Sequence, residues 1–430
     1  MSLARRSMIL GGPLALAAAA GLAACNPNAG TRSGTMNQIR FSWWGNADRQ
    51  ATTEAVLALF QEAHPEFTVS GEPGDISAYW DRLSTAVAAG DEPDVITMGG
   101  AYPAEYAARG LLLDLGQFTE QLDLAVIDDS ALSPGTVDGA VVGVPTGINA
   151  PAMIVNPAVL EAAGVAMPDT ATWTWDEYVE VSRAVTEGTE DGTYGSGTIL
   201  THDSLDLWAR QHGQNLYTED GALGLEKGTV QSFFELAATL VESGAAPGAD
   251  QLVELADAGT EQTLMGTGKA AFMATWSSSL TALSDALGEE LRIVPLPGEA
   301  ERPGAWLQPS QMYTVSARSA YPELAVTLVG FLLTDPEAGK LVLTDRGVPA
   351  VSSQREAIAG ELSATASAEV DYIEQLAGMT LAPTWIGPEG STAIEEITPR
   401  YQQEVLFGRR SAAEAADGWF DEATAAIGAS

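Results

Sequence analysis

The spacing of apolar and polar positions changes several times along the chain. Residues 39–45 alternate apolar and polar side chains, which is typical of a half-buried strand. Residues 46–65 then repeat apolar positions at helical spacing, and the helix is stopped by Pro65. Strands at 66–71 and 94–100, helices at 77–90 and 104–115, and an apolar edge complete this region. Because strands that alternate with helices pair in parallel, the pattern predicts an α/β sheet.

A second pattern follows the hairpin-type turn at Asp138-Gly139. The segments that flank Pro145 are expected to be extended, and residues 174–276 are rich in helices. Strands are expected at 291–297 and 311–316, and long helices from residue 321 to the end. A chain of 430 residues usually divides into two or three domains.

The first residues have the pattern of an export signal. Arg5 and Arg6 precede an uncharged run from Ser7 to Ala24. Glycines and a proline interrupt this run, which favours a cleaved signal over a permanent membrane helix. The paired arginines suit a twin-arginine signal, so Sec and Tat export both stay open.

Cys25 is the only cysteine of the chain, so no intramolecular disulfide can form. Together with Ala23 and Ala24 it resembles the lipobox of bacterial lipoproteins, in which the cysteine is acylated and becomes the first mature residue. The resemblance implies a signal peptide over residues 1–24, a lipid on Cys25 and a polar tether over 25–36, on the outer face of the cell membrane. An ordinary cleavage site with an incidental cysteine is the alternative.

The composition limits the partners. Aspartate and glutamate number 58 against 20 lysines and arginines, a formal net charge of −38. Removal of residues 1–24 takes away two arginines and no acid, which moves the charge by two units, from −38 to −40. Such a surface repels nucleic acid and anionic lipid headgroups, so no nucleic-acid partner is expected. A hydrophobic fraction of 46% with ten tryptophans is typical of a globular protein.

Five segments, in this order, resemble the extracellular solute-binding proteins of carbohydrate ABC importers, the family 1 group that includes maltose-binding protein. They are residues 41–69, 83–115 with Pro93-Asp94-Val95, 143–179, 266–276 and 346–351. The resemblance implies an α/β, two-lobed, periplasmic-binding-protein-like fold of type II, with lobes joined by hinge crossings. It places the N-terminal lobe at residues 37–142 plus 277–312, and the C-terminal lobe at 144–275 plus 316–430.

The same resemblance implies a function. A monomer would capture a sugar between its lobes, close over it, and be recognised by the membrane permease subunits of an ABC transporter. Such a protein is not an enzyme and needs no cofactor and no metal.

A sugar has apolar C–H faces and rims of hydroxyl groups, so its site needs aromatic rings and hydrogen-bonding side chains. In an open α/β sheet these groups follow the carboxyl ends of the strands. The residue positions alone favour Trp44, Asn46, Asp48, Tyr102, Gln308, Ser310 and Trp385, and the resemblance adds Asn149 and Trp276.

Several candidates have a structural alternative. Asn46 or Asp48 would also suit the N-cap of the next helix, and Trp44 and Tyr102 would also pack against helices. Trp80 has the spacing of a core residue. Arg346 is expected to interact with a helix C-terminus.

Two other functions stay open. A secreted carbohydrate-active hydrolase needs two carboxylates across the scissile bond, and abundant acids are no sign of such a pair. The chain has no Gly-x-Ser-x-Gly elbow, and His64, His202 and His212 have no zinc spacing. The same scaffold would also bind a polyamine or another small solute, because Asp48, Asp75 and Asp203 could face a cation.

Overall fold

The computed structural model describes residues 38–100, 102–127, 129–197, 202–256, 259–382, 384–385, 387–388 and 390–428. The predicted signal peptide, the tether and Cys25 lie outside these residues. Within the described ranges, no helix combines the length and apolar character that a membrane span requires.

The first sheet has five strands, in the order β2 (Thr68–Gly74), β1 (Gln38–Trp44), β3 (Val95–Met98), β11 (Gln308–Val315) and β6 (Val144–Asn149). Strand β1 pairs in parallel with β2 and β3, as the alternating pattern predicted. Strand β11 runs antiparallel to both β3 and β6, with a register irregularity between Pro309 and Met312. A small hairpin of β4 (Thr136–Val137) and β5 (Ala140–Val141) follows α4 (Asp129–Leu132).

Helices cover both faces of this sheet. Helix α1 (Ala47–Ala63) buries Val56 and Phe60 in the same apolar cluster as Ile39 and Phe41 of β1. Helix α2 (Ile76–Ala89) buries Tyr79 on the opposite face, in a cluster that also includes α3 (Tyr102–Ala108). Because helices cover both faces, β3 and β6 bury every one of their side chains, whereas the edge strand β2 stays largely accessible.

The second sheet has four strands, in the order β10 (Arg292–Val294), β7 (Pro151–Val155), β9 (Ala270–Trp276) and β8 (Tyr194–Ser196). Strand β7 is antiparallel to β9 and β10, and β8 is parallel to β9. The surrounding helices are α5 (Pro157–Ala163), α6 (Trp175–Gly188), α7 (His202–Gln211), α8 (Lys227–Glu242), α9 (Ala249–Leu255), α10 (Ser279–Leu287), α14 (Ala364–Ala377), α15 (Thr392–Leu406) and α16 (Ala412–Gly428). Thr174 and Glu177 form a reciprocal capping box that begins α6.

We call the five-stranded sheet with its helices the N-terminal lobe, and the four-stranded sheet with its helices the C-terminal lobe. The mixed α/β architecture with two lobes confirms the predicted fold class.

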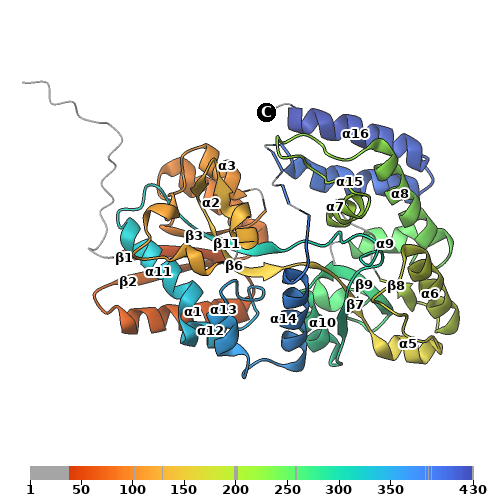
Figure 1. The fold of residues 1–430 in the computed structure, drawn as a ribbon, viewed down its shortest axis with the longest axis horizontal. Helices are drawn as coiled ribbons and strands as arrows, with labels where there is room; N and C mark the ends of the chain where they lie inside the picture. The colour runs from red at the N-terminus through yellow and green to blue at the C-terminus, as the bar shows by residue number, and fades with distance from the viewer. Residues whose placement is uncertain are drawn as a thin grey trace, which may run out of the picture. The chain divides into compact units, whose positions relative to one another are not determined.

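Three late helices pack in the N-terminal lobe. Helices α11 (Pro322–Thr334) and α12 (Pro336–Val342) contact α1, and α13 (Ser352–Ile358) contacts both of them. Figure 1 shows α1, α11, α12 and α13 together beside the five-stranded sheet. The resemblance had implied that residues 316–430 belong to the C-terminal lobe, and 277–312, which include α10 and β10, to the N-terminal lobe. Helical spacing could not have corrected this, because it marks a buried face without specifying which sheet the helix covers.

One residue links the two sheets where the chain first crosses between them. Strand β6 ends at Asn149, Ala150 is fully buried, and β7 begins at Pro151. The chain returns through residues 295–307, from β10 to β11.

A buried acid joins two helices of the C-terminal lobe. Glu369 of α14 is 1% exposed, and its Oε1 accepts a hydrogen bond from the Thr281 backbone N–H of α10. Burial raises the pKa of Glu369 to about 7, with a smaller contribution from Asp285, while hydrogen bonds from Thr281 and Thr344 oppose the shift.

This raised pKa predicts a pH-dependent stability. Between the usual value of 4.5 and about 7, the folded protein holds a proton that the unfolded chain releases. Protonated Glu369 therefore makes its full contribution to the free energy of unfolding below pH 4.5, and this contribution is lost as the pH rises from 4.5 to about 7. We expect Glu369→Gln to be neutral at pH 4 and to be more stable than wild type at pH 8, by about 3 kcal/mol. Urea unfolding of both proteins at the two pH values measures this, and an equal difference at both would contradict it.

Candidate functional site

A pocket of about 130 Å³ lies where β7 begins and β9 ends. Its lining is mostly apolar and comes from four segments of the C-terminal lobe: Pro151, Asp203, Ser204, Leu207, Ala274, Thr275, Trp276 and Leu296. Asp203 and Ser204, near the start of α7, supply a carboxylate and a hydroxyl group. Pro151 is paired with Trp276 across the two strands, so the pocket lies directly beside the crossing at Ala150.

Trp276 is partly exposed and is supported by a second indole ring. Its ring meets Trp306 edge-to-face, with centroids 5.9 Å apart and planes at 85°. Trp306 is buried, and its Nε1–H donates to Gln308 Oε1 at 2.8 Å. The structure thus brings Trp276 and Gln308 together through Trp306, a residue that sequence reasoning missed. Contact of Trp276 or Gln308 with a solute stays a prediction.

Trp306 is itself contacted by Arg210, a buried arginine of α7 that sequence reasoning also missed. The guanidinium carbon lies 5.4 Å from the centroid of the Trp306 ring. Its Nε donates to the Gly304 carbonyl at 2.8 Å, and its Nη2 donates to the Ala382 carbonyl at 2.7 Å. Burial lowers the pKa of Arg210. Arg210 therefore connects α7, the segment before β11 and the segment after α14 around the ring that supports Trp276.

A second aromatic group follows the strands of the N-terminal lobe. Trp44 is 9% exposed and packs against Tyr79 and Trp80 of α2, with centroids 5.1 and 5.4 Å away. Tyr102 stacks on Trp80 at 3.5 Å with planes 5° apart. Trp44 and Tyr102 thus pack against helix α2, as their structural alternative held, and their contact with a solute stays a prediction. Trp80, which the spacing assigned to the core, is only partly buried.

The pKa of the Tyr102 hydroxyl is raised above its usual value. Burial raises the pKa of Tyr102, and Glu105, Glu395 and Asp81 raise it further. Glu395 belongs to α15 of the C-terminal lobe, so a carboxylate of one lobe acts on a ring of the other.

Two polar candidates, Asn46 and Asp48, directly follow β1. Asn46 caps α1, because its side chain accepts a hydrogen bond from the Arg49 N–H at 2.9 Å. This confirms the capping alternative for Asn46. Asp48 is in the first turn of α1, and its side chain is outside the described part of the chain.

Asn149 is buried at the crossing between the lobes. Its Oδ1 accepts hydrogen bonds from the Ser277 hydroxyl at 2.7 Å and from the Ser278 N–H at 3.1 Å. The Ser277 N–H in turn donates to the Ala150 carbonyl at 2.8 Å. Asn149 therefore holds the crossing segment to the turn after β9, and a sugar contact of this residue stays a prediction.

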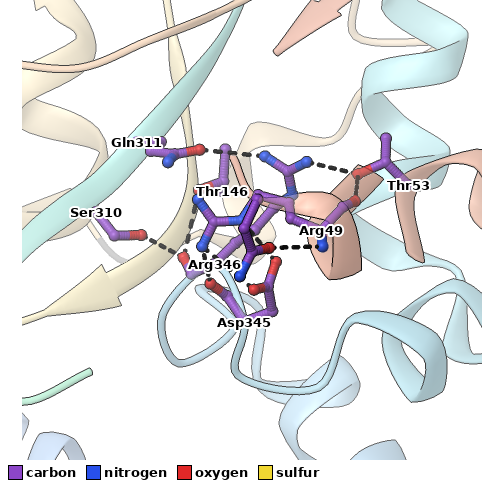
Figure 2. Close-up of polar contacts among 8 residues, drawn as sticks. Arg49, Thr53, Thr146, Ser310, Gln311, Asp345 and Arg346 are labelled. Atoms are coloured by element: carbon purple, nitrogen blue, oxygen red, sulfur yellow. Dashed lines mark hydrogen bonds and ion pairs between the residues drawn. The ribbon is translucent and has the colours of Figure 1, made fainter. Parts of the chain in front are cut away.

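Ser310 belongs to a polar network between β6, β11 and the segment that follows α12, which Figure 2 shows. Its hydroxyl donates to the Arg346 and Gly147 carbonyls, and the Thr146 hydroxyl donates to the same Arg346 carbonyl at 3.4 Å. These bonds fasten the segment that follows α12 to both β6 and β11. Contact of Ser310 with a solute stays a prediction.

Two arginines extend this network to α1 (Figure 2). Arg346 is 3% exposed, and its guanidinium donates to Gln311 Oε1 at 3.1 Å and to Thr53 Oγ1 at 2.8 Å. Arg49 forms an ion pair with Asp345 at 2.8 Å. The expected contact of Arg346 with a helix C-terminus is thus wrong, because its side chain turns inward to neutral partners on β11 and α1.

The remaining candidates give less information. Trp385 is partly buried in the segment between α14 and α15, and its contact with a solute stays a prediction. Within the described ranges, no group of three or more histidine, cysteine, aspartate or glutamate side chains is arranged to hold a metal ion.

Comparison with known families identifies the class of protein. A family model described as bacterial extracellular solute-binding protein matches residues 55–369. The chain therefore belongs to the bacterial extracellular solute-binding proteins, which confirms the resemblance found in the sequence.

Curated relatives and solved structures agree with this family. A binding protein of Brucella abortus (strain 2308) is 24% identical over 194 residues, 44% of this chain and 46% of that protein. An uncharacterized lipoprotein in the oleD 5′ region of Streptomyces antibioticus is 27% identical over 175 residues, 40% of this chain and 38% of that protein. The chain thus matches less than half the length of these relatives.

Two solved structures cover nearly the whole chain. A family 1 extracellular solute-binding protein from Alicyclobacillus acidocaldarius is 28% identical with a TM-score of 0.70, and the match covers 90% of this chain and 97% of that one. A periplasmic oligogalacturonide binding protein from Yersinia enterocolitica, in complex with saturated digalacturonic acid, is 24% identical with a TM-score of 0.78, covering 91% and 99%. The second likeness concerns the fold alone.

Proposed function

We propose that this protein captures a mono- or oligosaccharide outside the cytoplasm and delivers it to the permease of an ABC importer. The observation that carries the proposal is the pocket beside Trp276. An indole face suits the C–H face of a sugar, and Asp203 and Ser204 suit its hydroxyl groups. The oligogalacturonide named for the Yersinia protein is in keeping with a saccharide ligand.

Hinge closure would couple binding to delivery. A solute that bridges both lobes binds the closed form more tightly than the open form, and so shifts the population toward the closed form. Tyr102 and Trp80 would supply aromatic surface from the N-terminal lobe, while Trp276 would supply it from the C-terminal lobe. A permease would then recognise the closed form of a monomeric binding protein.

A thermal-shift screen of the purified protein tests this function. Neutral mono- and disaccharides, uronates and spermidine would be compared, and each stabilising compound would be recovered and analysed for cleavage. We expect a saccharide to raise the melting temperature and to be recovered intact. Stabilisation by spermidine alone would favour a polyamine carrier, and a cleaved sugar would favour the hydrolase.

We further propose that a lipid on Cys25 keeps the protein at the outer face of the membrane. The tether over residues 25–36 would leave the lobes free to reach the permease, and anchoring would raise their local concentration there. The Streptomyces relative named as a lipoprotein is in keeping with this.

Replacing the acylated residue tests the anchor. We expect Cys25→Ser to release the protein from the membrane fraction in soluble form, because no other cysteine can carry the lipid. Fractionation followed by immunoblotting measures the change, and wild-type protein expressed in parallel is the control. Retention of the variant in the membrane fraction would contradict the anchor.

A further inference from the structure

The first crossing changes from one lobe to the other within two residues. Ile148 exchanges two backbone hydrogen bonds with Val348, at 2.6 and 3.0 Å, which hold it to the segment that follows α12. The carbonyl of Ala150 accepts a hydrogen bond from the Ser277 N–H, in the turn after β9, at 2.8 Å. Ile148 is therefore fixed to the N-terminal lobe and Ala150 to the C-terminal lobe, so a rotation between the lobes would be concentrated at Asn149.

The second crossing changes lobe beside the first. Trp306 is buried in an apolar cluster of the C-terminal lobe, whereas the next residue, Leu307, is buried in the cluster that contains β1. Gln308 then begins β11 and is paired with Asn149 across the two strands. A third crossing, residues 359–363 between α13 and α14, is mostly exposed. An axis of rotation between the lobes would therefore pass through the pair of Asn149 and Gln308.

Ser277 binds the first crossing with its side chain as well as its backbone. Its hydroxyl donates to Asn149 Oδ1 at 2.7 Å and accepts a hydrogen bond from the Ala150 N–H at 3.2 Å. Ser278 donates its N–H to the same Asn149 oxygen at 3.1 Å. Because Ser277 is 1% exposed, these bonds form where water competes little. The side chain of Asn149 is thus held by the C-terminal lobe, although its backbone belongs to the N-terminal sheet.

Ser277 directly follows Trp276 in the chain. Trp276 lines the pocket and meets Trp306 edge-to-face, and Trp306 donates to Gln308 at 2.8 Å. The Trp276 ring is therefore connected to Asn149 through Ser277. On its other side, it is connected to Gln308 through Trp306. A solute that fixes this ring would act on both residues at which the crossings change lobe.

We propose that Ser277 is a positioning residue that couples a solute at Trp276 to the hinge, through its hydrogen bond to Asn149. The inference rests on the proposed function, because it requires a solute beside Trp276. Without this bond the first crossing has more rotational freedom, so fewer ligand-free molecules have the arrangement that can close. The apparent dissociation constant rises as that fraction falls. Because Ser277 is buried, it acts without touching the solute.

Calorimetric titration with maltose, cellobiose and α-1,4-galactobiose measures the effect on affinity. We expect Ser277→Ala to weaken the tightest binder at least about fivefold. Asn149→Ala is expected to weaken it by a similar factor, and the double variant to bind within about twofold of either single variant, because all three lack the same bond. If Asn149 acted by touching the sugar, Asn149→Ala would weaken binding as much in the Ser277→Ala background as in wild type. That additive result overturns the inference.

Distances between the lobes separate positioning from a local loss of structure. Spin labels would be attached to Glu62→Cys in α1 and Glu180→Cys in α6, both exposed, in a Cys25→Ser background that has no other thiol. Pulsed electron paramagnetic resonance measures the distribution of label-to-label distances. Without sugar, we expect a broader distribution in Ser277→Ala than in the wild-type background, and with saturating sugar the same distribution in both. Identical distributions without sugar overturn the inference.

Ser284→Ala is the matched control. Ser284 of α10 is 6% exposed, and its hydroxyl accepts a hydrogen bond from the Leu291 N–H at 3.3 Å, in the segment that follows the same helix. The substitution therefore also removes a buried hydroxyl from the C-terminal lobe. We expect wild-type affinity and a wild-type distance distribution. A loss equal to that of Ser277→Ala would assign the effect to lower stability and contradict the coupling.

The remaining outcomes are distinct. If circular dichroism shows that Ser277→Ala does not fold, Asn149→Ala removes the acceptor of the same bond and carries the same expectations. Tighter binding by a folded Ser277→Ala overturns the inference and leaves saccharide capture intact. Binding of no saccharide refutes the proposed function, whereas the distances measured without sugar still decide whether Ser277 restrains the lobes.

Discussion

Trp276→Ala is expected to weaken saccharide affinity at least tenfold, about 1.4 kcal/mol, while the melting temperature without ligand stays near that of wild type. The ring is partly exposed at the end of β9, so its removal deletes more ligand surface than core. The buried Trp306 and its bond to Gln308 do not require Trp276. Calorimetric titration with the best saccharide from the thermal-shift screen measures the loss.

A second substitution separates the loss of the ring from the loss of structure. Trp276→Phe keeps an aromatic face and an edge-to-face neighbour, so we expect it to retain most of the affinity. Unchanged affinity in Trp276→Ala would remove this residue from the site. A large fall in melting temperature would show instead that the ring is part of the core.

Gly147→Ala is expected to lower the free energy of unfolding by about 2–3 kcal/mol. Gly147 is in strand β6, where a Cβ atom would lie 2.3 Å from the Arg346 carbonyl oxygen and 2.8 Å from the backbone of Gly347. Both neighbours are backbone atoms, so they cannot turn away as a flexible side chain would, and the Arg346 carbonyl is also held by Ser310 and Thr146 in the network of Figure 2. Urea unfolding without ligand measures the change.

Gly228→Ala is the matched control for this change. Gly228 is in α8, with no atom within 4 Å of the position of an added Cβ. We expect its stability to stay within about 1 kcal/mol of wild type or to rise, because alanine favours a helix. Similar stability of Gly147→Ala and wild type would mean that the segment after α12 can move away from β6.

The sequence predicted the first part of the fold closely. Residues 39–45 alternate with a period of two and precede a helical pattern that Pro65 stops, and the structure has β1 at Gln38–Trp44 and α1 at Ala47–Ala63. Each of these signals is local, since it depends on neighbours within a few residues. Local signals cannot predict the lobe in which α11 packs, because that depends on which of two apolar sheets the helix covers.

In the candidate site, too, local motifs identified some residues, and contacts between distant segments were missed. Trp276 was found because its motif resembles a family position, and the structure places it in the lining of a pocket. Arg210 and Trp306 were missed because their roles arise from packing between segments that are about one hundred residues apart in the chain. Asn149 and Ser310 have polar side chains that suit a sugar and equally suit a backbone, and periodicity cannot distinguish the two.

The short crossing at Ala150 has a mechanical consequence. Pro151 lines the pocket and directly follows Ala150, so a solute in the pocket would act next to the fulcrum of the proposed closure. Rotation about a fulcrum displaces near atoms little and distant atoms much, so small adjustments at the pocket would be amplified at the far rims of the lobes. A fluorescent dye would therefore report binding best from a rim, and because Cys25 is the sole native thiol, a Cys25→Ser background would allow one to be attached at any chosen site.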